Sequence, residues 1–284
     1  MSEFWKRTLS GAVYVGVVVS SILVHPAFFG LVFLLVSMLA VRESHHLLQS
    51  ARATTLLSVI AAGLLFLACW MPFGLADVNV CYGGLMIICL ILYVLSVLTA
   101  LLAELWFKAE NPIMNWGNIL QAQIMIALPF ATMPWIAFID KYLLLAVFVL
   151  IWVNDSGAYC VGMLTSKLPG GNHKMFPRVS PKKSWEGLFG GLVFTIGVAF
   201  ILNRFGWFNA ITKEGNELLI ACGFAFIVSG FGTLGDLMES LFKRTIGVKD
   251  SGKFLPGHGG VLDRFDSILL AAPVVLIYVA MLLC

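Results

Sequence analysis

Long apolar runs alternate with short polar links along all 284 residues of the chain. The runs are continuous and about 20 residues long, which is the length of a membrane-spanning helix rather than of an alternating barrel strand. We therefore predict nine helices, near 9–25, 27–42, 53–72, 82–103, 118–138, 142–163, 187–204, 217–238 and 264–283. The first two are short and meet at His25-Pro26, so they could form a hairpin that spans the membrane only shallowly.

The composition agrees with this pattern. Hydrophobic residues make up 60% of the chain and charged residues only 12%, whereas soluble domains carry about 25% charged residues. The predicted fold class is an all-α, polytopic helical membrane protein that forms one bundle. Residues 1–140 would supply the anchoring helices and the wall on the lipid side, and residues 141–284 would carry the catalytic loops.

The distribution of Lys and Arg predicts the orientation. With nine spans, one side receives the N-terminus and the loops after the second, fourth, sixth and eighth helices. That side holds 15 of the 18 Lys and Arg residues, and the other side holds only Lys141, Arg204 and Lys213. By the positive-inside rule the basic side faces the cytoplasm, which predicts a polar cavity open to the cytoplasm.

The most polar segment is Ser240–Asp266, which lies between two apolar runs. Its basic residues suit phosphate oxygens, its aspartates suit a hard divalent cation, and its glycines allow backbone amides to approach a ligand. His258 has two interpretations, a structural histidine or a ligand contact, and the three glycines beside it favour the ligand.

Two aspartates are candidate metal ligands. Asp236 shares a helix face with Glu239, Ser240 and Lys243, because these residues follow helical spacing. Asp263 and Asp266 open the last helix, where they could act as a helix cap and a dipole partner. Capping does not account for Asp236 at membrane depth, so we favour metal binding by Asp236 and Asp263 over ion pairs with Lys or Arg.

Two further segments carry polar groups. Ser180-Pro181-Lys182-Lys183-Ser184 precedes a helix that Ser184 can cap, leaving backbone amides for an anion; the alternative is that both lysines only obey membrane topology. Asp155 lies deep in an apolar run beside Asn154, Ser156 and Tyr159. An intramembrane carboxylate costs at least ~2.5 kcal/mol unless it is paired or hydrated, so Asp155 has either a functional role or a structural pair with a lysine.

The segment 240–266 resembles the signature of the CDP-diacylglycerol synthases, also called phosphatidate cytidylyltransferases. The pattern is Ser-x2-Lys-Arg, then Lys-Asp, Pro-x-His-Gly-Gly and Asp-Arg-x-Asp, and every part is present in order. Gly235-Asp236, Asp155-Ser-Gly-Ala-Tyr and Ser-Pro-Lys-Lys-Ser-Trp-Glu-Gly are similar to further family motifs. Two departures occur: the link 165–176 is longer than expected, which affects Lys167, His173 and Lys174, and Ser184 stands where Thr is usual.

The resemblance implies transfer of a cytidylyl group from CTP to phosphatidic acid in phospholipid biosynthesis, with release of pyrophosphate. It implies Mg²⁺, with a second, monovalent cation left open, and a multi-pass location in the cytoplasmic (inner) membrane. No nucleic-acid partner is expected, and a homodimer is left open. The predicted metal ligands are Asp236 and Asp263. The predicted catalytic residues are Lys243, Arg244, Lys249, Asp250, His258, Arg264 and Asp266. The predicted substrate-binding residues are Asp155, Ser180, Lys182, Lys183, Ser184, Ser240, Gly259 and Gly260.

Three rival functions make different predictions. A CTP-dependent lipid kinase would use similar groups but would release CDP instead of pyrophosphate. An anion transporter would predict inverted repeats with paired broken helices, and the two halves do not match. A purely structural membrane protein would not need His-Gly-Gly beside Asp-Arg-x-Asp. A Walker phosphate loop is also absent from the sequence, so we favour the transferase.

Overall fold

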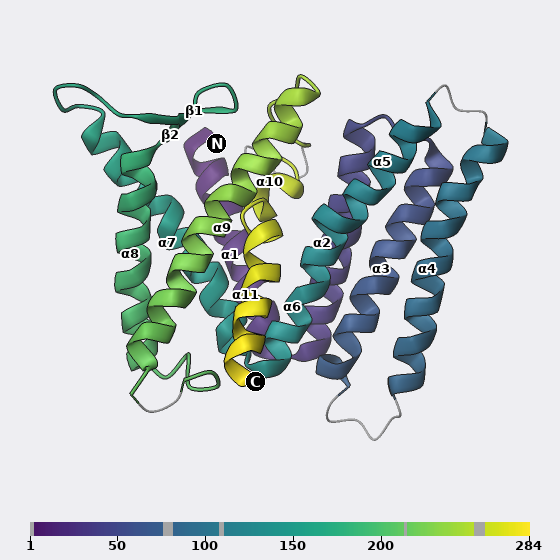
Figure 1. Ribbon diagram of the computed structural model, residues 1–284, viewed down its shortest axis with the longest axis horizontal. Helices are drawn as coiled ribbons and strands as arrows, with labels where there is room; N and C mark the ends of the chain where they lie inside the picture. The colour runs from purple at the N-terminus through teal and green to yellow at the C-terminus, as the bar shows by residue number, and fades with distance from the viewer. Residues whose placement is uncertain (1–2, 76–81, 108–110, 213–214, 253–258) are drawn as a thin grey trace. The chain divides into compact units, whose positions relative to one another are not determined.

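The computed structural model describes residues 3–75, 82–107, 111–212, 215–252 and 259–284 (Figure 1). Their elements, in chain order, are α1 (Glu3–Val24), α2 (Pro26–Leu47), α3 (Arg52–Gly74), α4 (Tyr82–Phe107), α5 (Pro112–Ala122), the π-helix η1 (Gln123–Ala127), α6 (Leu128–Ile139), α7 (Lys141–Thr165), β1 (Lys174–Phe176), β2 (Ser180–Ser184), α8 (Trp185–Arg204), α9 (Glu217–Thr245), α10 (Leu262–Phe265) and α11 (Ile268–Leu283).

Within the described residues, eight helical stretches are long and apolar enough to cross a membrane, and a shorter apolar stretch covers Thr8–Val24 of α1. The prediction of a multi-pass helical membrane protein is confirmed. The prediction that the second helix is short was wrong, because α2 is 22 residues long and continues to Leu47. The helix continues through its polar end because Glu43 and His45 find hydrogen-bond partners inside the protein.

The helices belong to two compact units. Unit 1 comprises Met1–Phe138 and Asp250–Phe265, and unit 2 comprises Ile139–Lys249 and Asp266–Cys284. Unit 1 therefore contains α1 to α5, η1, nearly all of α6, and α10. Unit 2 contains α7, β1, β2, α8, α9 and α11.

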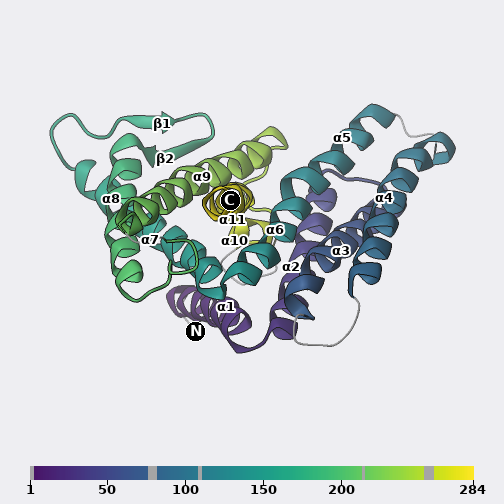
Figure 2. The same cartoon turned by 60° about the horizontal axis from the view of Figure 1, so that its bottom comes forward.

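Aromatic packing holds unit 1 together. Helices α2, α3 and α4 pack side by side (Figures 1 and 2), and Phe29 and Phe33 of α2 are fully buried. Phe265 of α10 makes edge-on contacts with the rings of Tyr14, Phe33 and Phe130. Such pairs contribute about 0.5–1.5 kcal/mol beyond the buried area, so they anchor the segment 259–265 in the core of unit 1.

A π-helical turn interrupts the helix that runs from Pro112 to Ile139. Pro129 has no backbone N–H, and its ring would clash with the carbonyl four residues earlier, which widens the preceding turn into η1. Gln123 at the start of this turn donates to the carbonyl and hydroxyl oxygens of Ser58, at 2.9 and 2.8 Å. The amide nitrogen of this buried side chain thereby links the turn to α3.

Helix α7 is the core of unit 2. Its residues Leu143 to Phe148 are all buried, and α8, α9 and α11 pack around it. The antiparallel hairpin of β1 and β2 lies at one end of α8 (Figure 1). We did not predict this hairpin, because its strands are three and five residues long and their polar sequence has no buried alternation.

Small residues on α8, namely Gly187, Gly190 and Gly191, bring α7 and α8 close together. A Cβ on Gly191 would lie 2.8 Å from the carbonyl oxygen of Asn154 and 2.7 Å from its Oδ1. Gly197 on the same helix has open space at this position. Close packing of backbones through small residues is a common way for membrane helices to associate.

We expect Gly191→Ala to destabilise the protein by about 1–3 kcal/mol, because a side chain cannot enter this contact without moving α8. Gly197→Ala is the matched control and should be neutral or slightly stabilising. Thermal unfolding of both variants in detergent checks this. Equal unfolding temperatures for the two variants would contradict the packing described above.

Candidate active site

The polar residues near the end of α9 form two pairs on one helix face. The hydroxyl of Ser240 donates to Asp236 Oδ1 at 3.2 Å, and Lys243 forms an ion pair with Glu239. Both Glu239 and Lys243 are buried. The helix then ends before Gly247, whose φ of +75° is the left-handed conformation that glycine adopts most easily. The predicted shared face is confirmed.

The hairpin is bonded to α9 by two basic side chains. Lys183 of β2 contacts Asp236 Oδ2 at 2.8 Å and donates to the carbonyl of Thr233 at 3.3 Å. Arg244 donates to the carbonyls of Val179 and Val248, at 3.4 and 3.1 Å. Arg244 was predicted to neutralise phosphate, and in this structure it fixes the loop between the strands.

A cavity of about 230 Å³ lies between the hairpin, α7, α8 and α9. Its walls include five predicted site residues: Asp155, Lys182, Lys183, Ser184 and Asp236. The volume is below the ~300–1,000 Å³ of pockets that enclose a whole ligand, so it suits part of a nucleotide, such as a phosphate group. Unit 2 thus brings together three motifs that are separated in the sequence.

Two neighbouring polar residues on α7 have different environments. Asn154 is buried, accepts from Ser229 at 2.6 Å and donates to Thr233 at 3.3 Å, which links α7 to α9. Asp155 is exposed and lines the cavity. Asn154 and Thr233 were missed as cavity residues; the position of Asn154 deep in an apolar run was the signal.

Ser184 caps α8, as predicted, by accepting from Gly187 N at 3.1 Å. The first backbone amides of α8 were expected to be available for an anion. One of them is already bonded, because Trp185 N donates to the carbonyl of His173 at 3.0 Å. Glu186 in the same turn accepts from the backbone and ring nitrogens of His173. This carboxylate makes the helix end less favourable for an anion, so anion binding here would depend on Lys182 and Lys183.

A further carboxylate of the predicted site, Asp266, belongs to unit 2. Asp266 lies near the charges of Asp236, Glu239 and Asp155. Gly235 permits this arrangement, because a Cβ there would lie 2.6 Å from the backbone carbonyl of Asp266. Oxygen ligands of this kind suit Mg²⁺, which commonly uses one or two carboxylates and keeps several waters. No cluster of three or more His, Cys, Asp or Glu in the described ranges is arranged as an all-protein metal site.

In unit 1, two carboxylates bind two stretches of the signature segment, one at Ser251 and the other at Gly260–Leu262. Asp263 Oδ2 accepts from Ser251 N, Ser251 Oγ and Gly260 N, at 2.8, 2.9 and 2.8 Å. Glu43 of α2 accepts from Ser251 Oγ at 3.0 Å and from Leu262 N at 2.7 Å. Glu43 was missed by sequence reasoning, because its partners are more than 200 positions away.

Two glycines of the signature are required by the local structure. Gly259 has a φ of +80°, and a side chain on Gly260 would collide with Glu43 and Ser251. The backbone carbonyl of Arg264 accepts a hydrogen bond from the hydroxyl of Tyr14 at 3.0 Å. Its buried Nε has no hydrogen-bond partner among the described residues, which leaves a donor for an anionic ligand.

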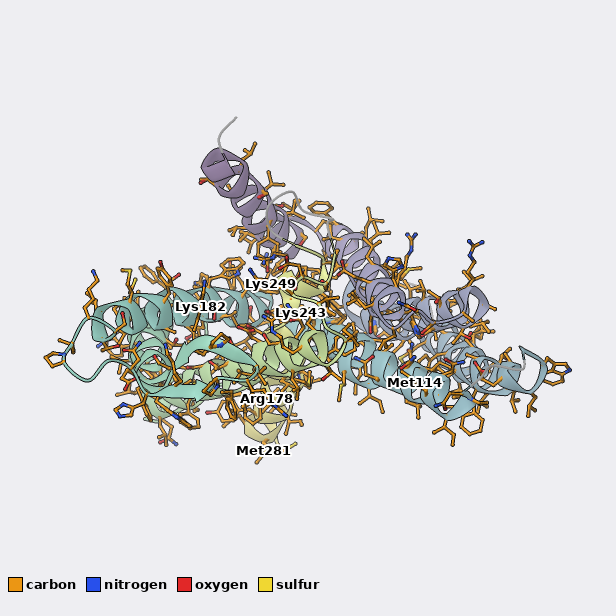
Figure 3. The ribbon with its side chains drawn as sticks, turned by 90° about the horizontal axis from the view of Figure 1, so that it is seen from above. Met114, Arg178, Lys182, Lys243, Lys249 and Met281 are labelled. Atoms are coloured by element: carbon orange, nitrogen blue, oxygen red, sulfur yellow. The ribbon has the colours of Figure 1, made fainter. Side chains whose placement is uncertain are left out.

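The other predicted residues lie as follows. Lys249 and Asp250 are exposed after α9, and Ser180 begins β2 without lining the cavity. Figure 3 views one end of the helices and labels Lys182, Lys243, Lys249 and Arg178 of unit 2 there. His258 lies outside the described residues. Asp236 belongs to unit 2 and Asp263 to unit 1, so their predicted shared metal ion stays a prediction.

Known proteins show similarity to this chain. A phosphatidate cytidylyltransferase of Staphylococcus epidermidis is 44% identical over 133 residues, which cover 47% of this chain and 46% of the relative. Those of Staphylococcus saprophyticus and Staphylococcus aureus are 46% identical over 132 residues, which cover 46% of each chain. The match thus spans about half the length of these relatives.

The sequence model of the cytidylyltransferase family matches residues 5–282, which is nearly the whole chain. This match includes both parts of unit 1 and both parts of unit 2 that carry the predicted site. The chain therefore belongs to the cytidylyltransferase family.

Proposed function

We propose that this protein is a phosphatidate cytidylyltransferase, which transfers CMP from CTP to phosphatidic acid. The observation that carries the proposal is the cavity of unit 2, where Lys182, Lys183, Asp155 and Asp236 meet. Membership of the cytidylyltransferase family and the names of the relatives support the same reaction. The basic residues suit phosphate oxygens, and the acidic residues suit a divalent cation.

The chemical difficulty of this reaction is repulsion between two anions. An oxygen of the lipid phosphate would attack the α-phosphorus of CTP, and the bond from that phosphorus to the bridging oxygen would break, releasing pyrophosphate. The attacking phosphate is already deprotonated at neutral pH, so no strong general base is required. Catalysis would come from positioning and from neutralising charge.

Lys182 and Lys183 are the residues that we propose to hold CTP phosphates. Lys183 is partly buried and oriented by Asp236 and by the carbonyl of Thr233. A lysine held in this way requires little reorganisation when charge develops in the transition state. Lys182 is exposed at the same cavity and can meet the nucleotide as it enters.

Mg²⁺ is part of the proposal. The carboxylate oxygens of unit 2 have the right chemistry, and Asp236 is the proposed ligand there; Asp263 keeps its predicted role in unit 1, with its carboxylate oriented by three donors. When bound, the ion would supply charge neutralisation for phosphate oxygens. A second, monovalent cation, a homodimer and a location in the cytoplasmic membrane with the site facing the cytoplasm remain predictions.

The first test uses the full chain in detergent with phosphatidic acid, Mg²⁺ and CTP labelled in the cytosine ring. We expect the label to enter the organic phase, with an equal amount of pyrophosphate released. A CTP-dependent lipid kinase would instead release labelled CDP into the aqueous phase. Label that stays aqueous with folded protein would reject the cytidylyltransferase.

Lys183→Met should lower kcat/KM for CTP by about 100-fold or more, which is the usual effect of removing one preorganised donor. Lys141→Met is the matched control, because Lys141 begins α7 and lies over the ring of Tyr142, away from the cavity residues. Steady-state kinetics of both variants check this. Normal kcat/KM in Lys183→Met would remove this lysine from the site.

Asp236→Asn should lower activity at least 100-fold and raise the Mg²⁺ concentration needed for half-maximal rate, because a neutral amide is a poor ligand for a hard cation. Asp140→Asn is the control, since Asp140 caps α7 and Asn caps helices equally well. The measurement is a Mg²⁺ titration of initial rates. An unchanged Mg²⁺ dependence in Asp236→Asn would refute the metal role.

A further inference from the structure

Unit 1 contains a second hollow, of about 1100 Å³, which the mechanism above does not use. Its walls come from α2 and α3, which run side by side (Figure 2), from the turn that joins them, and from the signature segment. The residues from the last source are Ser251, Gly252 and Val261. A cavity of this size exceeds the usual range for a small-molecule pocket, so it is large enough for a lipid.

The lining is amphipathic along its length. On α2, Leu39, Arg42 and His46 follow spacing of three and four, so they share one helix face. On α3, Arg52, Leu56 and Val59 do the same. In both helices the basic residues lie nearer the connecting turn and the apolar residues lie further along the helix. The hollow therefore has a cationic end and a hydrocarbon-like end.

The cationic end offers donors that the described part of the chain does not neutralise. Arg42 and Arg52 are exposed, and none of the ion pairs formed by the described residues includes either of them. Helix α3 begins after Ala51, which has no capping side chain. The first amides of α3 therefore add the positive end of a helix dipole beside Arg52.

The acidic residue in the wall has partners other than the two arginines. Glu43 directs Oε2 to Ser251 Oγ and Leu262 N, and so it holds the signature segment against α2. The turn between the helices is also held by hydrogen bonds: Ser50 N donates to the carbonyl of His45 at 3.0 Å, and the His45 ring contacts Ser50 Oγ at 3.0 Å. Hydrogen bonds thus fix the backbone on which the cationic end of the hollow lies.

We propose that this hollow binds phosphatidic acid, with the phosphate at Arg42, Arg52 and the start of α3, and an acyl chain along Leu39, Leu56 and Val59. Two guanidinium groups and a helix N-terminus match a phosphomonoester, which carries more charge than the phosphodiester of most other lipids. The assignment rests on the proposed function for the identity of the lipid. It adds a lipid-binding site in unit 1, at a wall that the signature residues share.

The test measures binding directly, apart from turnover. Native mass spectrometry of the full chain in detergent gives the affinity for dioleoyl phosphatidic acid, with dioleoyl phosphatidylcholine as the lipid of no net charge. We compare wild type, the double variant Arg42→Gln/Arg52→Gln, and Leu56→Trp, which fills the apolar end. Arg204→Gln is the control, because Arg204 ends α8 over the ring of Phe200, outside the hollow.

We expect the double variant and Leu56→Trp each to bind phosphatidic acid at least tenfold more weakly, with phosphatidylcholine binding unchanged by the arginine substitutions. In steady-state assays the KM for phosphatidic acid should rise while the KM for CTP stays the same. Wild-type affinity in both variants would overturn the proposal. Displacement of the lipid by glycerol 3-phosphate at equal concentration would also overturn it, because the acyl chain would then contribute nothing.

The two proposals fail separately. Wild-type protein that binds phosphatidic acid through Arg42 and Arg52, but transfers no label from CTP, would reject the cytidylyltransferase and support the lipid site. Protein that transfers the label, and whose two variants keep wild-type lipid affinity and KM, would reject the lipid site alone.

Discussion

The ion pair between Lys183 and Asp236 is the interaction on which the candidate site of unit 2 depends. It joins β2 to α9 at 2.8 Å and so gives the cavity both its basic and its acidic walls. An uncompensated carboxylate at membrane depth is unfavourable, and an isolated strand of five residues has little stability of its own. Each partner therefore needs the other to stay in place.

The same requirement for partners organises the signature segment in unit 1. Asp263 and Glu43 each accept from Ser251. Together they bind Ser251, Gly260 and Leu262 with hydrogen bonds between 2.7 and 3.0 Å. Charged hydrogen bonds contribute more than neutral ones. The glycines follow from this arrangement, since Gly260 leaves room for Glu43. Both carboxylates therefore have a structural role in unit 1.

Much of the fold was predictable because each apolar run is long enough to span a membrane by itself. The positions of all nine predicted helices are matched by helices of the structure, and the helix face of Asp236, Glu239, Ser240 and Lys243 follows directly from the 3.6-residue repeat. The cap at Ser184 could also be predicted from nearby residues, because it depends on one hydroxyl. The close approach of α8 to α7 depends on the small residues of α8. The hairpin was not predictable, because its strands are held by α9 rather than by their own sequence.

The sequence by itself determined the membrane class, the helix positions and the residue types of the site, because hydrophobic length and local spacing need no tertiary contact. Only the tertiary structure decided which polar groups meet. Asn154 binds Ser229 and Thr233, Arg244 holds the hairpin loop, and Glu43 holds Ser251. These partners are separated by tens to hundreds of residues, and no periodic pattern links them. Their pairing follows from the cost of leaving a buried polar group without a partner once the helices have packed.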